Sequence, residues 1–258
     1  MHSNFSEVTM KNNNNLKIAI LGYGSMGKEV EKIANVKNIE ITDIFDINNR
    51  ISPTEKYDFD IAIDFTFPDA VLDNVKILSG MNKNIIIGTT GWDKYFSEVK
   101  QLIEQNNIGL VYASNFSLGM QMFMRIVDFA SKQIATLTDY DIFMNEIHHR
   151  RKKDAPSGTA LVLANNIIKN VPSKKDILTN QSEGEISNEK LFVSSTRGGE
   201  ITGIHSIYID SLADTIELNH RAKNRSGFAT GAVEAAIWLG NKRGIYDFAD
   251  IINEILGI

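Results

Sequence analysis

The sequence has 258 residues, of which 43% are hydrophobic and 23% are charged, and its formal net charge at pH 7 is -5. At about 150 residues per domain, this length indicates one large domain or two modest ones. The negative charge excludes general nucleic-acid binding, which needs a broad surplus of Lys and Arg to neutralise phosphates. No apolar run approaches the roughly 20 residues of a membrane helix, so we expect no membrane partner.

The chain contains no cysteine, which excludes disulfides and thiolate metal sites and is typical of a reducing compartment. Its first fifteen residues, MHSNFSEVTMKNNNN, lack the apolar segment of a secretory signal. Their Asn run predicts a disordered lead-in, with Met10 as an alternative start. A cytoplasmic location is therefore expected.

The first half of the chain alternates apolar runs of strand character with helical patterns. The strands are expected at 16–21, 39–46, 58–67, 84–91 and 108–116. A first helix follows the first strand, Pro68 suits the start of a second, and residues 93–107 are expected to form a third. Strands alternating with helices pair in parallel, so a Rossmann-like, doubly wound α/β domain is predicted over residues 1–117.

The pattern changes after residue 117. The elements expected next are a helix over 118–135, a strand over 140–149, a helix over 158–170 and a polar loop over 173–189. Three strands then follow without helices between them, over 190–196, 200–210 and 214–220. This order favours antiparallel or mixed pairing, so residues 118–225 are predicted to form a second, α+β domain with an open mixed sheet.

The chain ends with two expected helices, over 228–240 and 246–257. Their pattern fits either domain. We assign residues 226–258 to the first domain.

A glycine-rich turn follows the first strand. Gly22, Gly24 and Gly27 form the pattern G-x-G-x-x-G, and the residues between them are Tyr23, Ser25 and Met26. One glycine permits the tight turn, one lets the backbone approach a pyrophosphate, and one allows close packing of helix and strand. Because the following helix N-terminus also stabilises negative charge, the turn predicts a dinucleotide site, with an ordinary glycine turn as the alternative.

Asp46 follows the second strand, nineteen residues after Gly27. A carboxylate at this place accepts hydrogen bonds from an adenosine ribose and repels a 2'-phosphate. The next three residues carry no positive charge, so NADH is predicted to be preferred, while the nearby Arg50 leaves NADPH use open. The alternative is a solvated turn aspartate.

Two more motifs stand at the carboxyl ends of expected strands. They are Gly88, Thr89 and Thr90 in GTTG, and Ala113, Ser114, Asn115 and Phe116 in ASNF. Ligands bind at this edge of an open α/β sheet. The shared edge with the glycine turn favours nicotinamide contacts over plain turn chemistry.

The stretch EIHHRRKKDAPSGTA, residues 146–160, concentrates two histidines and four consecutive cations in an acidic chain. Its end, PSGT, predicts a helix start whose N–H groups and hydroxyls suit an anion. We therefore predict a carboxylate-binding site, with a solvated charged loop as the alternative. Adjacent His148 and His149 point to opposite faces of a strand, so no metal site is predicted, but histidine suits proton donation.

Together these motifs resemble the family of 4-hydroxy-tetrahydrodipicolinate (dihydrodipicolinate) reductases of the diaminopimelate route to lysine. The family signature is E-x-H-H-x-x-K-x-D-A-P-S-G-T-A. Supporting blocks follow in order over nearly the whole chain: IDFT at 63–66, GTTG, ASNFSLG, RGGEITGIH at 197–205 and the block at 219–239.

The resemblance implies an NAD(P)H-dependent oxidoreductase that transfers hydride to ring C4 of a small cyclic imine dicarboxylate, with loss of water. It implies that His148 is the acid and that Lys152 stabilises the anionic or enamine form. Implied substrate contacts are His149, Lys152, Ser157, Gly158 and Thr159. Implied cofactor contacts are the glycine turn, Asp46, Gly88 to Thr90, Ala113 to Phe116, Arg225 and Phe228.

The resemblance also implies a homotetramer assembled through the sheet of the second domain, and closure about hinges near residues 117 and 226. The sequence departs from the family pattern around the cofactor. The glycine turn lacks an arginine before Met26, and Phe67 and Ile47 stand where some members carry arginine, while Ser114 replaces a common alanine. These departures affect cofactor preference more than reaction type.

Two other functions fit the same architecture. One is an oxidoreductase for another substrate, such as an aspartate or sugar dehydrogenase, although the cationic stretch favours a small dicarboxylate over a sugar. The other is a nucleotide-binding protein without activity, which would be expected to lack His148 or Lys152.

Overall fold

The computed structural model describes residues 16–179 and 184–257. The predicted lead-in and the alternative start at Met10 lie outside these residues. The chain divides into two compact units, one made of the chain before Ser117 together with the chain after Gly227, and the other of Ser117–Gly227. Each unit has its own sheet and its own hydrophobic core.

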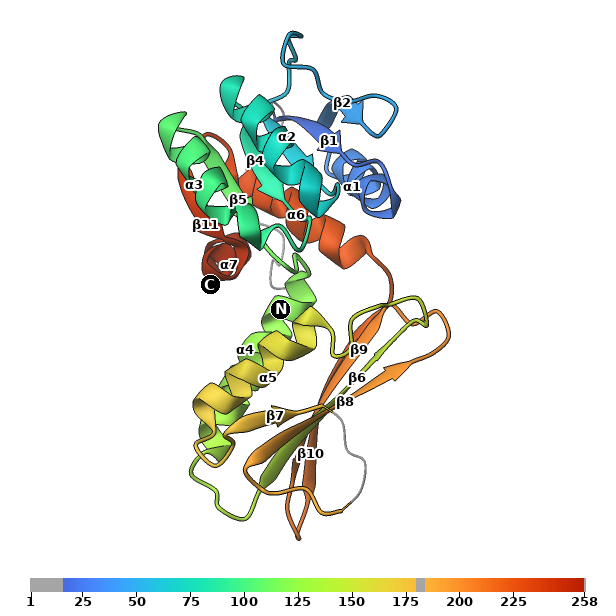
Figure 1. Ribbon diagram of the computed structural model, residues 1–258, viewed down its shortest axis with the longest axis vertical. Helices are drawn as coiled ribbons and strands as arrows, with labels where there is room; N and C mark the ends of the chain where they lie inside the picture. The colour runs from blue at the N-terminus through green and yellow to red at the C-terminus, as the bar shows by residue number, and fades with distance from the viewer. Residues whose placement is uncertain (1–15, 180–183, 258) are drawn as a thin grey trace, which may run out of the picture. The chain divides into compact units, whose positions relative to one another are not determined.

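The first unit is built on a six-stranded parallel sheet with the strand order β11-β5-β4-β3-β1-β2 (Figure 1). The strands are β1 (Lys17–Leu21), β2 (Glu40–Phe45), β3 (Ile61–Asp64), β4 (Asn84–Ile87), β5 (Gly109–Tyr112) and β11 (Gly244–Asp247). Every residue of β3 and β4 is buried. In the sequence, such strands are short, nearly continuous apolar runs, because helices cover both faces of a parallel sheet. The predicted Rossmann-like domain is confirmed.

In the described part of this unit, the sheet is accompanied by the helices α1 (Ser25–Val36), α2 (Pro68–Gly80), α3 (Phe96–Gln105), α6 (Ser226–Leu239) and α7 (Phe248–Leu256). In Figure 1, α2 and α3 lie in front of the sheet and α6 lies behind it. Lys37 at the end of α1 pairs with Glu234 of α6 at 2.6 Å. The chain runs from β1 outward to β2 and then returns to β3 on the other side of β1, which creates the switch point where such sheets bind ligands.

Two predicted helices of this unit are wrong in their bounds. The helix expected over 246–257 starts at Phe248, because residues 244–247 form β11, which pairs in parallel with β5. Asp247 ends that strand and caps α7, since its Oδ1 accepts from the N–H of Ala249 at 2.8 Å. The helix expected from residue 93 begins as a 3-10 turn, η1 (Asp93–Tyr95), and becomes α-helical only at Phe96.

Replacing Gly27 with alanine is expected to destabilise the protein by roughly 1–3 kcal/mol. The added Cβ would lie 2.4 Å from the carbonyl oxygen of Gly22, which is backbone and has little freedom to move. Gly24→Ala is the control, because its Cβ would meet no heavy atom within 4 Å. Urea unfolding of both variants measures the difference, and equal midpoints would contradict the close packing at Gly27.

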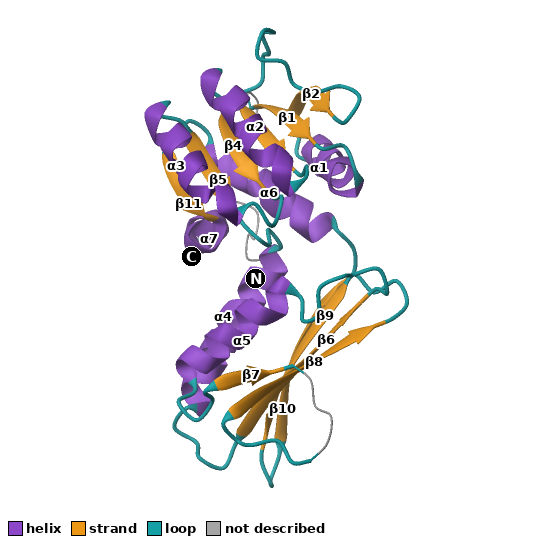
Figure 2. Ribbon diagram, in the orientation of Figure 1, coloured by secondary structure: helices purple, strands orange, loops and turns teal. Residues whose placement is uncertain are grey.

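The second unit carries a five-stranded mixed sheet with the order β10-β9-β6-β8-β7 (Figure 2). Its strands are β6 (Asp141–His148), β7 (Asp176–Leu178), β8 (Lys190–Arg197), β9 (Gly203–Asp210) and β10 (Thr215–Ala222). The β6 strand is parallel to β8 and antiparallel to β9. The predicted open mixed sheet is confirmed.

Helices α4 (Leu118–Ile134) and α5 (Gly158–Asn170) pack on one face of this sheet. The β6 strand shows the expected alternation, with Ile142, Met144, Glu146 and His148 buried and the residues between them only half-buried. Two apolar side chains of β6 thus enter the core, while the last two positions of the same face carry a carboxylate and an imidazole.

Two predictions for the second unit are also wrong in detail. The loop expected over 173–189 contains the short edge strand β7, which pairs with β8. Buried Lys174 supports it by donating to the carbonyl oxygens of Asn188 and Lys190 at 2.9 and 3.1 Å. The strand expected from residue 200 begins at Gly203, because Gly199 takes a φ of +54° in the turn after β8.

Candidate active site

The predicted cofactor-binding motifs of the first half of the chain gather at one edge of the six-stranded sheet. The glycine turn follows β1, Asp46 follows β2, Gly88 follows β4 and Ala113 follows β5. All these strands are parallel, so their carboxyl ends meet at the same edge. This is the edge at which open α/β sheets bind ligands.

The glycine turn has the geometry that a pyrophosphate site needs. Gly22 has a φ of +88°, and a Cβ there would lie 2.4 Å from the carbonyl oxygen of Phe65, so only glycine fits. Gly24 precedes α1 and leaves open space where a side chain would stand. The N-cap residue, Gly24, has no side chain with which to cap this helix N-terminus, so the first N–H groups of the helix fit a bound anion. The turn therefore fits a dinucleotide.

Asp46 is exposed and partly used by its own loop. Its Oδ1 accepts from the backbone N–H groups of Asn48 and Asn49 at 2.7 and 3.0 Å. Asp46 thus does stabilise its own turn, which was the alternative to a ribose contact in the sequence analysis. Within the described residues these contacts engage only Oδ1, and Oδ2 is the oxygen that suits a ribose hydroxyl.

Asp64, at the end of β3, joins two of the loops at this edge. The carboxylate is 1% exposed, and its Oδ1 accepts from the hydroxyls of Thr66 and Thr89 at 2.7 and 2.9 Å. Its Oδ2 accepts from the amide of Asn74 at 2.8 Å. A buried carboxylate with several donors holds its neighbours firmly. Asp64 therefore fixes the IDFT and GTTG loops relative to each other.

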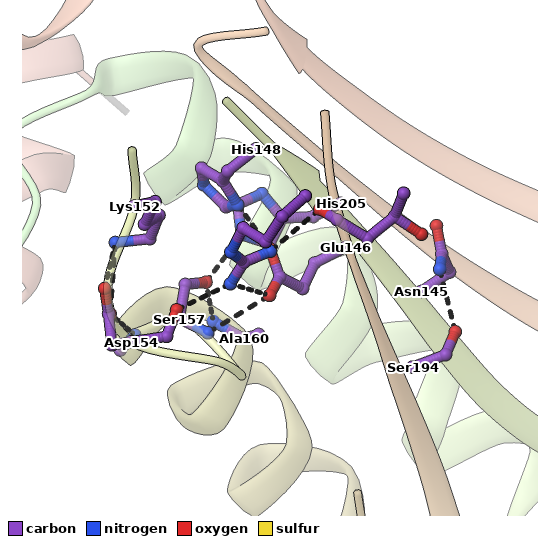
Figure 3. A network of polar contacts seen from close by, with 12 residues as sticks. Asn145, Glu146, His148, Lys152, Asp154, Ser157, Ala160, Ser194 and His205 are labelled. Atoms are coloured by element: carbon purple, nitrogen blue, oxygen red, sulfur yellow. Dashed lines mark hydrogen bonds and ion pairs between the residues drawn. The ribbon is translucent and has the colours of Figure 1, made fainter. Parts of the chain in front are cut away.

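The second group of candidate residues lies at the end of β6, on the side of the sheet that faces the helices (Figure 3). His148 and Glu146 are two positions apart on one strand, so their side chains share a face. The Nδ1 atom of His148 contacts Oε2 of Glu146. The other oxygen, Oε1, accepts from Arg197 at 2.6 Å and from the N–H of Ser157 at 3.3 Å.

Glu146 has no exposed surface. Burial alone would raise the pKa of its carboxyl, but the hydrogen bonds from His148 and Arg197 lower that pKa to about 2. Glu146 is therefore ionised at neutral pH. Its donors come from β6, from the end of β8 and from the start of α5, so the carboxylate joins three elements at one point.

Lys152 lies in the turn between β6 and α5. Its Nζ pairs with Asp154 at 2.8 Å. Asp154 also accepts from the N–H of Gly158 at 3.3 Å, which connects the lysine to the start of α5. Burial tends to raise the pKa of the Asp154 carboxyl, but the hydrogen bond from Lys152 lowers it overall. A cation is thus held beside a helix N-terminus, an arrangement that suits a carboxylate ligand.

Ser157 is the N-cap of α5, and its Oγ accepts from the N–H of Ala160 at 3.2 Å. The same oxygen lies 3.3 Å from Nε2 of His205. His205 is 4% exposed, and burial lowers its pKa to about 4, with a further contribution from nearby His148. His205 is therefore neutral at pH 7 and orients the serine as a neutral hydrogen-bonding group.

The other predicted substrate contacts, His149 and Thr159, lie in the turn after β6 and in the first turn of α5. His149 begins the turn after β6, its N–H donates to the carbonyl oxygen of Ile201 at 2.8 Å, and its buried Nδ1 has no partner among the described residues. Thr159 is half-buried in the first turn of α5.

Of the two cofactor contacts expected late in the chain, Arg225 belongs to the second unit and Phe228 to the first.

Four residues of this cluster had no role in the sequence prediction: Glu146, Asp154, Arg197 and His205. All four lie in the quoted motifs, Glu146 and Asp154 in the signature and Arg197 and His205 in the block at 197–205. The spacing of Glu146 and His148 on one strand also indicates that these two side chains share a face. Among the described residues, no group of three or more His, Cys, Asp or Glu side chains could hold a metal ion. None of the helices in that part of the chain is both long and apolar enough to cross a membrane.

Comparison with models of protein families identifies the family of this chain. Residues 16–116 match the model "Dihydrodipicolinate reductase, N-terminus", and residues 119–252 match "Dihydrodipicolinate reductase, C-terminus". The chain belongs to the dihydrodipicolinate reductase family. The resemblance inferred from the sequence motifs is confirmed.

Relatives named 4-hydroxy-tetrahydrodipicolinate reductase match nearly the whole chain. The protein from Christiangramia forsetii is 34% identical over 242 residues, which cover 93% of this chain and 99% of that protein. The protein from Methanosarcina mazei is 36% identical over 239 residues, or 91% of this chain and 88% of that protein. The family match thus extends over both units.

Solved structures agree with the family. The dipicolinate-bound dihydrodipicolinate reductase from Paenisporosarcina sp. TG-14 has a TM-score of 0.66 and 28% identity, covering 92% of this chain and 99% of that one. An amine dehydrogenase from Mycobacterium smegmatis has a TM-score of 0.58 at 10% identity, covering 91% and 95% of the two chains. The second likeness shows a shared fold only, so it gives no support to the dehydrogenases considered as alternatives.

Proposed function

We propose that this member of the dihydrodipicolinate reductase family reduces 4-hydroxy-tetrahydrodipicolinate to tetrahydrodipicolinate, with loss of water, in the diaminopimelate route of lysine biosynthesis. The observation that carries the proposal is the cluster of His148, Lys152 and the start of α5, built from the family signature. A binding protein without activity would have no need to keep an acid and a cation together there. Four relatives that match 84–93% of this chain carry the name of the reductase.

The substrate is a cyclic imine with two carboxylates, so it brings negative charge to an acidic protein. Carboxylates need a positive charge and N–H donors. The residues that would supply them are Lys152, His149 and the start of α5 at Ser157, Gly158 and Thr159. Concentrating cations in one turn raises the local concentration of such a ligand. We assign carboxylate binding to these residues.

Loss of the C4 hydroxyl together with a proton from C5, as water, gives a double bond conjugated with the imine. The nicotinamide would supply, when bound, the hydride for C4 of this conjugated system. The electron pair of the C4–C5 double bond then forms a C5–C6 double bond, and the electron pair of the imine moves onto the nitrogen. His148 donates the proton that completes the reduction, and Lys152 stabilises the anionic or enamine form by its positive charge. Cofactor binding is assigned to residues 1–117 and 226–258, and substrate binding to residues 118–225.

Three further features belong to the proposal. The face of the second sheet opposite the helices carries the stacked rings of Phe143 and Tyr208, 5.0 Å apart, which suits assembly through this sheet into a homotetramer. Asp46 and the absence of cations at residues 47–49 favour NADH over NADPH. A cytoplasmic location follows from the biosynthetic role and the lack of cysteine.

The purified protein is expected to oxidise NADH faster than NADPH when a separate synthase supplies the substrate from pyruvate and aspartate semialdehyde. Asp46→Asn keeps an acceptor for Asn48 and Asn49 but removes the charge. It should raise the KM for NADH about tenfold and lower the KM for NADPH, because the repulsion of the 2'-phosphate is lost. Absorbance at 340 nm measures both.

Asp73→Asn is the matched control, since Asp73 is an exposed carboxylate on α2 whose side chain is 78% accessible. Its KM values should equal those of the wild type. Equal use of both cofactors by the wild type would remove the role given to Asp46 and leave the reaction unchanged. No oxidation of either cofactor would contradict the proposed function.

A further inference from the structure

The proposed mechanism leaves the buried carboxylate of Glu146 without a task. Taking an ion out of water costs several kcal/mol unless good partners compensate it. Among the described residues, the partners of Glu146 include Arg197, the N–H of Ser157 and the proposed acid, His148. A buried charge joined directly to an acid is a candidate for control of its proton.

The partners of Glu146 fix which atoms carry hydrogen. Its Oε1 accepts from Arg197 and from the backbone N–H of Ser157, and both of these groups can only donate. Its Oε2 faces Nδ1 of His148. An ionised carboxylate can only accept, so Nδ1 must carry a proton in the neutral as well as the charged imidazole. The proton that His148 exchanges is then the one on Nε2.

The surroundings of Nε2 fit this assignment. A Cβ at residue 203 would lie 3.0 Å from Nε2, so the glycine there leaves room beside the exchanging nitrogen. His205, the cross-strand neighbour of Glu146, stands edge-on to the His148 ring with the ring centres 5.3 Å apart. These contacts hold the ring in one orientation.

We propose that Glu146 is a positioning residue that keeps a proton on Nδ1 of His148 and thereby reserves Nε2 for proton transfer to the substrate. The proposal rests on the role of His148 given under the proposed function. Glu146 itself touches neither substrate nor cofactor in this scheme. It acts through the tautomer and the orientation of the imidazole.

The substitution Glu146→Gln should move the proton of the neutral His148 imidazole from one ring nitrogen to the other. One end of the glutamine amide must be its NH2 group, and that group cannot face Arg197 and the N–H of Ser157, which are both donors. The NH2 group must therefore face Nδ1 of His148. Nδ1 then becomes an acceptor, the neutral tautomer reverses to Nε2–H, and the imidazolium form is disfavoured because its Nδ1–H would meet another donor.

The first experiment is 15N NMR of the whole protein labelled at histidine. The wild type should show His148 protonated at Nδ1 in its neutral form, and the signals that vanish in His148→Asn identify the residue. In Glu146→Gln the proton should move to Nε2. A wild-type His148 protonated at Nε2 alone would overturn the proposal, whether or not the variant folds and whether or not the protein reduces the proposed substrate.

The second experiment separates positioning from general damage. Glu146→Gln should lower kcat by about tenfold to a hundredfold. The Kd for dipicolinate, measured by calorimetry, should change by less than about threefold, because the carboxylate-binding residues are intact. Glu189→Gln, an exposed glutamate of the same unit, should leave both values unchanged. An unchanged kcat together with a reversed tautomer would also overturn the proposal.

Discussion

Replacing His148 with asparagine is expected to lower kcat by roughly a hundredfold to ten-thousandfold, the usual contribution of a general acid. Asparagine places an amide donor near the position of Nδ1, so Glu146 keeps a partner while the exchangeable Nε2 proton is lost. The variant should therefore fold, and thermal unfolding measures that. Steady-state rates with NADH and the synthase-coupled substrate measure kcat.

The neighbouring His149 provides the comparison. It lies outside the Glu146 cluster and is assigned to the substrate carboxylates, so His149→Asn should raise the KM for the substrate and change kcat much less. A larger loss of kcat in His149→Asn than in His148→Asn would exchange the two assignments. This pair tests the direction of two adjacent side chains that the sequence alone could only place on opposite faces.

The fold could be predicted where the signal is local. The parallel sheet follows from continuous apolar runs that alternate with helical patterns, since strands buried on both faces are apolar at most of their positions. The β11 strand was missed because Ile245 and Tyr246 continue into the apolar pattern of α7, and only pairing with β5 makes them a strand. The β7 strand is three residues long and depends on contacts of Lys174 to residues more than a dozen positions away.

The active-site residues, too, could be predicted only where neighbouring residues in the sequence carry the signal. The signature placed His148, Lys152 and the start of α5 in one short stretch, so local sequence was enough to predict them together. Arg197 reaches Glu146 from 51 positions away, and His205 reaches Ser157 from 48 positions away. These partners depend on the register of β6 with β8 and β9, which no local pattern determines. Glu146 itself could have been assigned from the two-residue period of a strand.

Replacing Lys152 with methionine should lower kcat/KM for the substrate by about a hundredfold to a thousandfold, because a positive charge that stabilises the anionic form is lost. The whole Lys152 side chain is only 25% exposed, and methionine preserves most of its apolar stem, so the packing of the turn should be kept. The unpaired Asp154 is half-exposed, and losing such an ion pair costs only about 0.2–1 kcal/mol of stability. Rates and urea unfolding midpoints measured on one preparation give both values.

Lys153→Met is the matched control, since Lys153 is the next cation in the same run and is exposed. If the turn attracted the substrate only through its total charge, the two variants would lose activity equally, and the loss would shrink as salt is raised. A specific role requires that Lys152→Met be far worse than Lys153→Met at every salt concentration. The position of Lys152 beside Asp154 and the start of α5 predicts this second outcome, because the charge acts at a fixed point and not as part of a diffuse field.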